Sequence, residues 1–375
     1  MRPVGGQSRI GCSPVSTMSA TAVAGGAKRL PSSILPPVCR YRRPRAGRSR
    51  APSSAVAAVD ETRVCAHDVA QRHARHNQRM RPRSVGIVGV GNMGLAMALR
   101  LRELGHDLHV RDIDPEREAL AARAGGRTAA TPGEVAARCD ALIVAVVDAA
   151  QTEAVLFGGD GAAAALRPGA CVLLCPTIAP ASTERVAAQL AARSIDVIDA
   201  PMSGGPARAR SGTMSMMVAC TDATYEKQRD LVEALANPVF RLGERVGDGA
   251  RAKLVNNLLA AINLAGAAEA LVLAERVGLD PARMLDVIER SSGQSWIGSD
   301  RMRRAVAGDL APRAHTTLLA KDSALAIAMA SFAGIAPPLG SVAAETFAAA
   351  VAAGHGGEDD ASLLAFLRGR CSGAG

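Results

Sequence analysis

The segment at residues 84–104 constrains the fold more than any other part of the chain. An apolar run, SVGIVGV, leads directly into the glycine-rich loop GVGNMG, and a run with helical periodicity follows. A GxGxxG loop between a strand and a helix is typical of a dinucleotide-binding βαβ unit, because its glycines permit a tight turn and close approach of a pyrophosphate. The residues predicted to hold the cofactor phosphates are Gly89, Gly91, Asn92, Met93 and Gly94.

Strand-like and helix-like runs continue to alternate up to about residue 243. Further apolar runs that predict strands lie at 106–113, 141–147, 171–176 and 194–201. Strands separated by helices of this length indicate crossover units and a doubly wound parallel sheet. We therefore expect an α/β fold with a Rossmann-type NAD-binding domain at residues 80–243.

Beyond residue 243 only helical periodicity remains. The run from Lys253 to Gly278 predicts one long helix, and further apolar helical periods separated by Gly and Pro continue to the C-terminus. We expect an all-helical domain for substrate binding and dimerisation at residues 244–375. The long helix has more apolar surface than one small domain needs, so a homodimer or homotetramer is expected.

The first 79 residues differ from the rest in charge. They hold 14 Lys and Arg against 3 Asp and Glu, whereas the remainder holds 30 against 32, although the whole chain carries +9. A nucleic-acid surface would have to come from this segment alone, so binding of nucleic acid is not expected. Its Arg-, Ala-, Pro- and Ser-rich composition predicts disorder. Three origins stay open: an over-extended start ahead of Met80, a transit peptide and a basic arm.

The eight cysteines are scattered and form no CxxC pair. This pattern argues against a zinc site or a disulfide framework, so we expect no metal and a reducing compartment, the cytoplasm. The longest apolar run, ALIVAVV at 141–147, is far shorter than the roughly 18 residues that a membrane span needs. No association with a membrane is expected.

The second predicted strand ends in an acidic residue that bears on the choice of cofactor. Asp112 lies 23 residues after Gly89, where a carboxylate accepts hydrogen bonds from the adenosine ribose and repels a 2′-phosphate. Asp112 therefore favours NAD, and the neighbouring Arg111 keeps NADP as the alternative.

Three later segments combine residue types that can bind or transform a small acid. They are DAPMSGG at 199–205, GDGARAKLVNN at 247–257 and LLAKD at 318–322. A serine and two glycines after a strand can present a hydroxyl and free N–H groups to a carboxylate, and Lys253 and Asn257 share one helix face. Taken singly, each is more often an ordinary turn, a solvated helix face or an exposed charge pair.

Together with GVGNMG, these segments occur in an order and spacing that resemble the β-hydroxyacid dehydrogenase family, over residues 84 to about 368. The resemblance implies an NAD-dependent oxidoreductase that acts on the CH–OH group of a small hydroxy acid. Two stretches, 146–158 and 291–302, are similar to the branch of the family that acts on L-threonate. The second stretch departs from the pattern of that branch at Gln294 and at 297–300, and these positions are expected to border the substrate tail. The acidic segment 356–360, to which the similarity continues, is equally well explained as a helix N-terminus.

Carried over by position, the resemblance gives each motif a role. Lys253 becomes the catalytic acid/base, and Asn257 a partner of the reacting hydroxyl. Ser203, Gly204 and Gly205 become the substrate-binding residues. Val147, Thr177 and Lys321 complete the expected cofactor site, the last two near the nicotinamide.

The chemistry of hydride transfer agrees with a lysine at this position. Oxidation of an alcohol needs a base for the hydroxyl proton, and the reverse reaction needs an acid. A lysine whose pKa is lowered by partial burial near Arg251 can do both. Two alternatives stay open: an NAD(P)H-dependent semialdehyde reductase such as one for tartronate semialdehyde, and a non-catalytic NAD-binding protein with a nucleic-acid-binding tail. The presence of Lys253 argues against the second.

Overall fold

The computed structural model describes the backbone of residues 83–372 and the side chains up to Arg370. All of these residues belong to one compact unit, Glu61–Gly375. The predictions for residues 1–79 lie outside the described residues.

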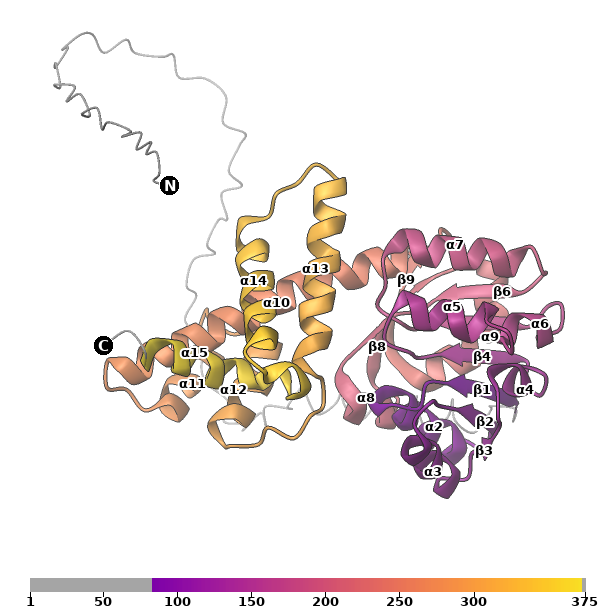
Figure 1. Ribbon diagram of the computed structural model, residues 1–375, viewed down its shortest axis with the longest axis horizontal. Coiled ribbons are helices and arrows are strands. Elements are labelled where there is room, and N and C mark those ends of the chain that lie inside the picture. The colour runs from indigo at the N-terminus through magenta and orange to yellow at the C-terminus, as the bar shows by residue number, and fades with distance from the viewer. Residues whose placement is uncertain (1–82, 373–375) are drawn as a thin grey trace, which may run out of the picture. The chain divides into compact units, whose positions relative to one another are not determined.

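The first part of the described chain is built on one mixed sheet with the order β3-β2-β1-β4-β5-β6-β8-β7, in which β9 also pairs with β8 (Figure 1). Strands β1 to β6 pair in parallel, as predicted. The strands are β1 (Ser84–Val88), β2 (Asp107–Arg111), β3 (Arg127–Thr128), β4 (Ala141–Val144), β5 (Cys171–Leu174), β6 (Asp196–Asp199), β7 (Met202–Ser203), β8 (Met214–Ala219) and β9 (Ala236–Gly243).

One edge of the sheet contains strands that the sequence did not predict. Strand β8 runs antiparallel to β6 and β7, and parallel to β9. The chain reverses here because no full crossover helix separates β6 from β7, and the turn into β8 uses Gly212 at a φ of 71°. The predicted doubly wound parallel sheet is thus confirmed over β1 to β6, and β7, β8 and β9, which the sequence did not predict, make the whole sheet mostly parallel.

Helices cover both faces of the sheet (Figure 1). Side chains of β1 and β4 alternate between two buried clusters, so that Ile143 packs with residues of α2 and α9 whereas Leu142 packs with α4 to α7. This alternation follows from the two-residue period of a strand. The helices are α2 (Asn92–Glu103), α3 (Pro115–Arg123), α4 (Pro132–Ala136), α5 (Ala149–Phe157), α6 (Ala162–Ala165), α7 (Pro180–Ala191), α8 (Gly205–Ser211) and α9 (Asp222–Leu235).

The second part contains only helices, as predicted, and packs around one long helix (Figure 1). Its core combines Leu264 and Leu271 of the long helix with side chains such as Phe347. The elements are α10 (Asp248–Arg276), α11 (Pro281–Glu289), α12 (Trp296–Val306), α13 (Thr316–Phe332), α14 (Pro338–Ala352), the 3-10 turns η1 (His355–Gly357) and η2 (Asp360–Ser362), and α15 (Leu363–Ser372).

Helix α10 is also long and apolar enough to cross a membrane by length and composition, the one such helix in residues 83–372. It contacts α11, α12, α13, α14 and α15 in the folded structure. Its apolar residues are therefore explained by its place at the centre of the helical part.

Candidate functional site

A cavity of about 570 Å³ brings most of the predicted site residues together. It lies where loops after the strands meet α10 and α13, so residues far apart in sequence share one space. The predicted residues that line it are Gly91, Asn92, Met93, Val147, Thr177, Ser203, Gly204, Gly205, Lys253, Asn257 and Lys321. Three others, Gly89, Gly94 and Asp112, lie outside the lining.

The glycine loop has the close contacts that only glycine tolerates. Gly89 has a φ of +93°, and a Cβ on Gly94 would lie 1.9 Å from the Gly89 carbonyl oxygen. At Gly91 a Cβ would meet nothing within 4 Å, and this residue opens α2. The loop thus packs tightly against its own helix and leaves open space at the helix N-terminus, where a pyrophosphate fits.

Asp112 is held next to this loop by backbone contacts. Its Oδ2 accepts a hydrogen bond from the Val90 N–H at 2.6 Å, and its Oδ1 accepts one from the Asp114 N–H at 3.0 Å. The neighbouring Arg111 donates to Glu118 Oε1 at 2.7 Å. The carboxylate of Asp112 therefore stays beside the loop, while the positive charge of Arg111 is already paired.

A single buried carboxylate ties the sheet to the start of α10. Asp199, the last residue of β6, accepts hydrogen bonds from the backbone N–H groups of Gly247 at 2.8 Å and Ala250 at 3.1 Å. Burial raises the pKa of Asp199 to about 6, although these N–H groups act in the opposite direction. Asp199 thereby fixes the serine-glycine turn that follows β6 relative to the first turns of α10, which carry Lys253.

Lys253 lies on the face of α10 that lines the cavity and is only 8% exposed. Burial lowers the pKa of its ammonium group to about 8; the Asp322 carboxylate opposes this shift and the Lys321 ammonium adds to it. The expected influence of Arg251 was wrong, because Arg251 forms ion pairs with Glu184 and Asp248 instead.

The Lys-Asp pair at the start of α13 connects the two parts of the site. Lys321 Nζ donates to the Thr177 carbonyl oxygen at 2.5 Å and to Asp322 Oδ1 at 2.7 Å. Asp322 is 7% exposed, and its Oδ2 accepts a hydrogen bond from Asn257 Nδ2 at 2.6 Å. Because a carboxylate only accepts, this bond fixes the orientation of the Asn257 amide. Sequence alone favoured an exposed charge pair here, and it gave Asp322 no role.

The cavity is also lined by residues of α12 and of the turns before α13 and α15. Of the positions expected to border the substrate tail, Ile297 lines the cavity. Trp296 and Arg301 of the stretch 291–302 and Asp360 of the segment 356–360 line it as well. No role was predicted from the sequence for the other charged and hydrogen-bonding residues of the lining, namely Arg117, Asn256, Asn263, Arg313, His315 and Asp322. Only the spacing of Asn256 and Asn263, which are seven residues apart on one helix and so share a face, was a usable signal.

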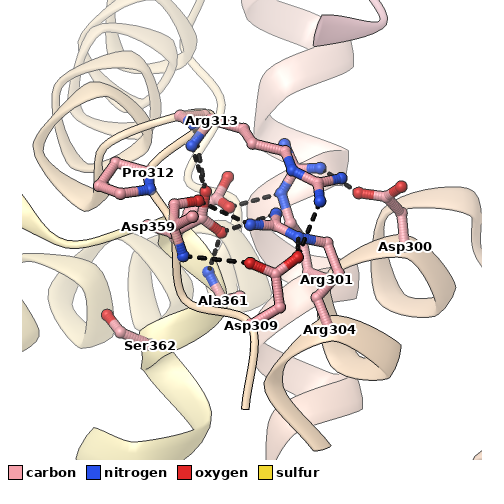
Figure 2. A network of polar contacts seen from close by, with 12 residues as sticks. Asp300, Arg301, Arg304, Asp309, Pro312, Arg313, Asp359, Ala361 and Ser362 are labelled. Atoms are coloured by element: carbon pink, nitrogen blue, oxygen red, sulfur yellow. Dashed lines mark hydrogen bonds and ion pairs between the residues drawn. The ribbon is translucent and has the colours of Figure 1, made fainter. Parts of the chain in front are cut away.

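The loop that carries Arg313 is anchored by a buried carboxylate, shown in Figure 2. Asp359 is fully buried and accepts hydrogen bonds from Arg304 Nη1 at 3.0 Å and from the Arg313 N–H at 2.7 Å. The N–H groups of Ala314 and Ala361 complete its partners. Burial acts to raise the pKa of Asp359, but these N–H groups and Arg304 outweigh it, so the pKa lies below its ordinary value.

This loop also touches the glycine loop. Asn92 Nδ2 donates to the carbonyl oxygens of Pro312 and Arg313, each at 3.4 Å, while Asn92 Oδ1 accepts from Arg117 Nη1 at 3.2 Å. The Asp359 anchor therefore supports one wall of the cavity.

The fold and the site together define a class. A mostly parallel sheet with a glycine loop at its carboxyl edge, facing a buried lysine on an all-helical part, is the arrangement of a two-part nicotinamide-dependent oxidoreductase.

Comparison with known proteins narrows this class. Residues 84–243 match the family described as the NAD binding domain of 6-phosphogluconate dehydrogenase, and residues 247–367 match the family described as NAD-binding of NADP-dependent 3-hydroxyisobutyrate dehydrogenase. The chain belongs to the β-hydroxyacid dehydrogenase family, as the resemblance predicted. It is an NAD(P)-dependent hydroxyacid dehydrogenase that acts on a CH–OH group.

Individual relatives cover the same region. L-threonate dehydrogenase of Cupriavidus necator is 40% identical over 287 residues, which are 76% of this chain and 97% of the relative. 3-Hydroxyisobutyrate dehydrogenase of Pseudomonas aeruginosa is 32% identical over 295 residues, 76% of this chain and 99% of the relative. The crystal structure of a 3-hydroxyisobutyrate dehydrogenase from Salmonella typhimurium is 36% identical with a TM-score of 0.71, and the match covers 76% of this chain and 99% of that chain.

Proposed function

We propose that this protein oxidises L-threonate, or a hydroxy acid closely related to it, with NAD and with Lys253 as the acid/base. The observation that carries the proposal is the meeting of buried Lys253, Asn257 and the Ser203-Gly204 turn in one cavity with the glycine loop. The likeness to L-threonate dehydrogenases supports the choice of acid.

Each residue of the site has a task that its chemistry supports. The Ser203 hydroxyl and the N–H groups of Gly204 and Gly205 suit a carboxylate; both glycines have positive φ values, 123° and 75°, which turn the backbone in a way that other residues rarely allow. Neutral Lys253 takes the hydroxyl proton, and Asn257, oriented by Asp322, hydrogen-bonds the reacting oxygen. The nicotinamide, when bound, supplies the hydride acceptor.

The surroundings of Asp112 support NAD over NADP. Its carboxylate lies beside the glycine loop, where a 2′-phosphate would meet a like charge. Arg111 is the cation next to it, and Glu118 already neutralises that cation while also accepting from the Asp112 N–H at 3.0 Å. A 2′-phosphate would therefore meet the carboxylates of Asp112 and Glu118 and a guanidinium, that of Arg111, which is already paired with Glu118.

Replacing Asp112 by Asn should weaken this preference. Asn keeps an oxygen for the Val90 N–H but removes the charge, so the ratio of kcat/KM with NAD to kcat/KM with NADP should fall by about tenfold or more, since juxtaposed like charges cost several kcal/mol. Initial rates with each cofactor measure the ratio. Glu116→Gln, an equal change of charge on exposed α3, is the control; if both variants shift the ratio equally, Asp112 has no special part in the choice.

The function itself is tested by a spectrophotometric screen of the purified full chain at the absorbance of the reduced nicotinamide. We expect oxidation of L-threonate with NAD to exceed that of 3-hydroxyisobutyrate. Reduction of tartronate semialdehyde with NADH or NADPH, measured in the same way, tests the alternative that the protein is a semialdehyde reductase. Oxidation of none of the hydroxy acids with either cofactor would contradict the proposal.

The proposal includes assembly and location. Exposed apolar side chains gather at the end of α13 and the start of α14, at Phe332, Ile335, Leu339 and Val342, and they support a homodimer or homotetramer formed through the helical part. The described cysteines, Cys139, Cys171, Cys175 and Cys220, are free and buried, which supports a reducing compartment such as the cytoplasm.

A further inference from the structure

The cavity continues along α10 beyond the residues that would perform the reaction. Asn257, Ala260 and Asn263 line it on successive turns of the helix, so that Asn263 lies about 9 Å further along the axis than Asn257 at 1.5 Å per residue. An acid bound through its carboxylate at Ser203 and oxidised at Lys253 has this stretch available for its remaining carbons.

The far end of the stretch carries a charge cluster with an excess of negative charge. Arg301 is 11% exposed and is ion-paired with both Asp300 and Asp360. Two carboxylates thus surround one guanidinium, which also lies 6.0 Å from the centre of the Trp296 ring. The guanidinium of Arg313, whose loop connects this cluster to the glycine loop, is paired with Asp309 at 2.8 Å (Figure 2). A second carboxylate on the substrate would therefore be repelled here.

Two polar groups at this end are nevertheless free to form hydrogen bonds with a substrate. Within residues 83–372, Arg301 Nη2 and the side-chain amide of Asn263 make no hydrogen bond to the protein, although both residues line the cavity. An apolar tail would cover these groups and remove their water without replacing it, which costs free energy. A hydroxyl group can accept from Arg301 or Asn263 and donate to a carboxylate or amide oxygen.

We infer that Asn263, Arg301 and Asp360 form a subsite for the hydroxyl groups of the substrate that are not oxidised. The subsite selects a polyhydroxylated monocarboxylic acid over an acid with a methyl branch or a second carboxylate. This inference rests on the proposed function and names the residues that give it its substrate class.

The test compares two four-carbon acids in the full-length protein: L-threonate, which is linear and carries additional hydroxyls, and 3-hydroxyisobutyrate, which carries a methyl branch instead. Asn263→Leu should lower the ratio of kcat/KM for threonate to that for 3-hydroxyisobutyrate by about tenfold, the effect of one lost hydrogen bond to a buried polar group. Arg301→Met should lower it at least as much. Arg303→Met is the matched control on the same helix: Arg303 is half-exposed, pairs with Asp286 and Glu289, and should leave the ratio within about twofold.

Asn263→Leu decides the question even where Arg301→Met disturbs folding, because the Asn263 amide has no hydrogen bond within the described protein to lose. If Asn263→Leu lowered kcat/KM for both acids by the same factor, the subsite would be overturned and the proposed function would stand. A wild-type preference for 3-hydroxyisobutyrate over threonate would overturn both the subsite and the choice of threonate as the substrate. Oxidation of neither acid by the wild type would instead contradict the proposed function, and the subsite with it.

Discussion

Replacing Lys253 by Met is expected to lower kcat by about a hundredfold to ten-thousandfold, the usual contribution of a positioned acid/base, while NAD still binds. Met has a similar length and suits a buried position, because Lys253 is only 8% exposed. The glycine loop and Asp112 contact neighbours other than Lys253. Steady-state rates give the loss, and titration of NADH fluorescence gives the affinity.

The pH profile of the wild type supplies a second measurement of the same assignment. Burial brings the pKa of Lys253 to about 8, and only the neutral amine can accept the hydroxyl proton. The kcat/KM for oxidation should therefore rise with pH through a midpoint near 8, whereas kcat/KM for carbonyl reduction should fall through the same region. The residual rate of Lys253→Met should lose this titration.

Lys227→Met is the matched control for this variant. Lys227 is an exposed lysine of α9 whose ammonium pairs with Asp196 at 3.0 Å, so the same chemical change is made away from the cavity. Its kcat should stay within about twofold of the wild type, because exposed ion pairs contribute little. If Lys253→Met kept more than a few per cent of wild-type activity, Lys253 would not be the acid/base.

The fold was predictable because its signals are local. The glycine loop lies directly between a strand and a helix. Asp114 and Pro115 are residue types that favour a helix start, and α3 begins there, with the Asp114 side chain accepting from the Glu116 N–H at 2.9 Å. Such patterns depend on neighbours in sequence. The antiparallel turn at β8 was missed because it depends on the chain reversal after β6.

The site was predictable only in part, for a physical reason. Lys253 and Asn257 share a helix face, so their proximity follows from sequence spacing. The partner of Asn257 is Asp322, 65 residues away in the sequence, and the support of α10 comes from Asp199, 48 residues before Gly247. Contacts of this kind exist only after the sheet and the helices pack together, so no local sequence pattern predicts them.

Replacing Asp359 by Ala is expected to destabilise the helical part by about 3–5 kcal/mol, the cost of removing one member of a buried ion pair. The variant would leave the Arg304 guanidinium without its buried partner and three backbone N–H groups without an acceptor. Thermal unfolding followed by circular dichroism should show the loss as a lower midpoint, roughly 2–4 °C for each kcal/mol.

Asp286→Ala provides the comparison for this stability effect. Asp286 pairs with Arg303 at 2.9 Å, but both side chains are about half exposed, so its removal should change stability by less than about 1 kcal/mol. Equal shifts of the unfolding midpoint in the two variants would contradict the role of Asp359 as an anchor.

The destabilisation should also depend on pH in a defined direction. The pKa of Asp359 is lowered in the folded protein, so the stability that its charge contributes is present above the unfolded value near 4 and is lost as the pH falls through the folded value. The difference in the free energy of unfolding between wild type and Asp359→Ala should therefore be largest at pH 7 and should decrease at acidic pH. Because the anchored loop contacts Asn92, the variant should also bind NAD more weakly at pH 7, at a temperature where it remains folded.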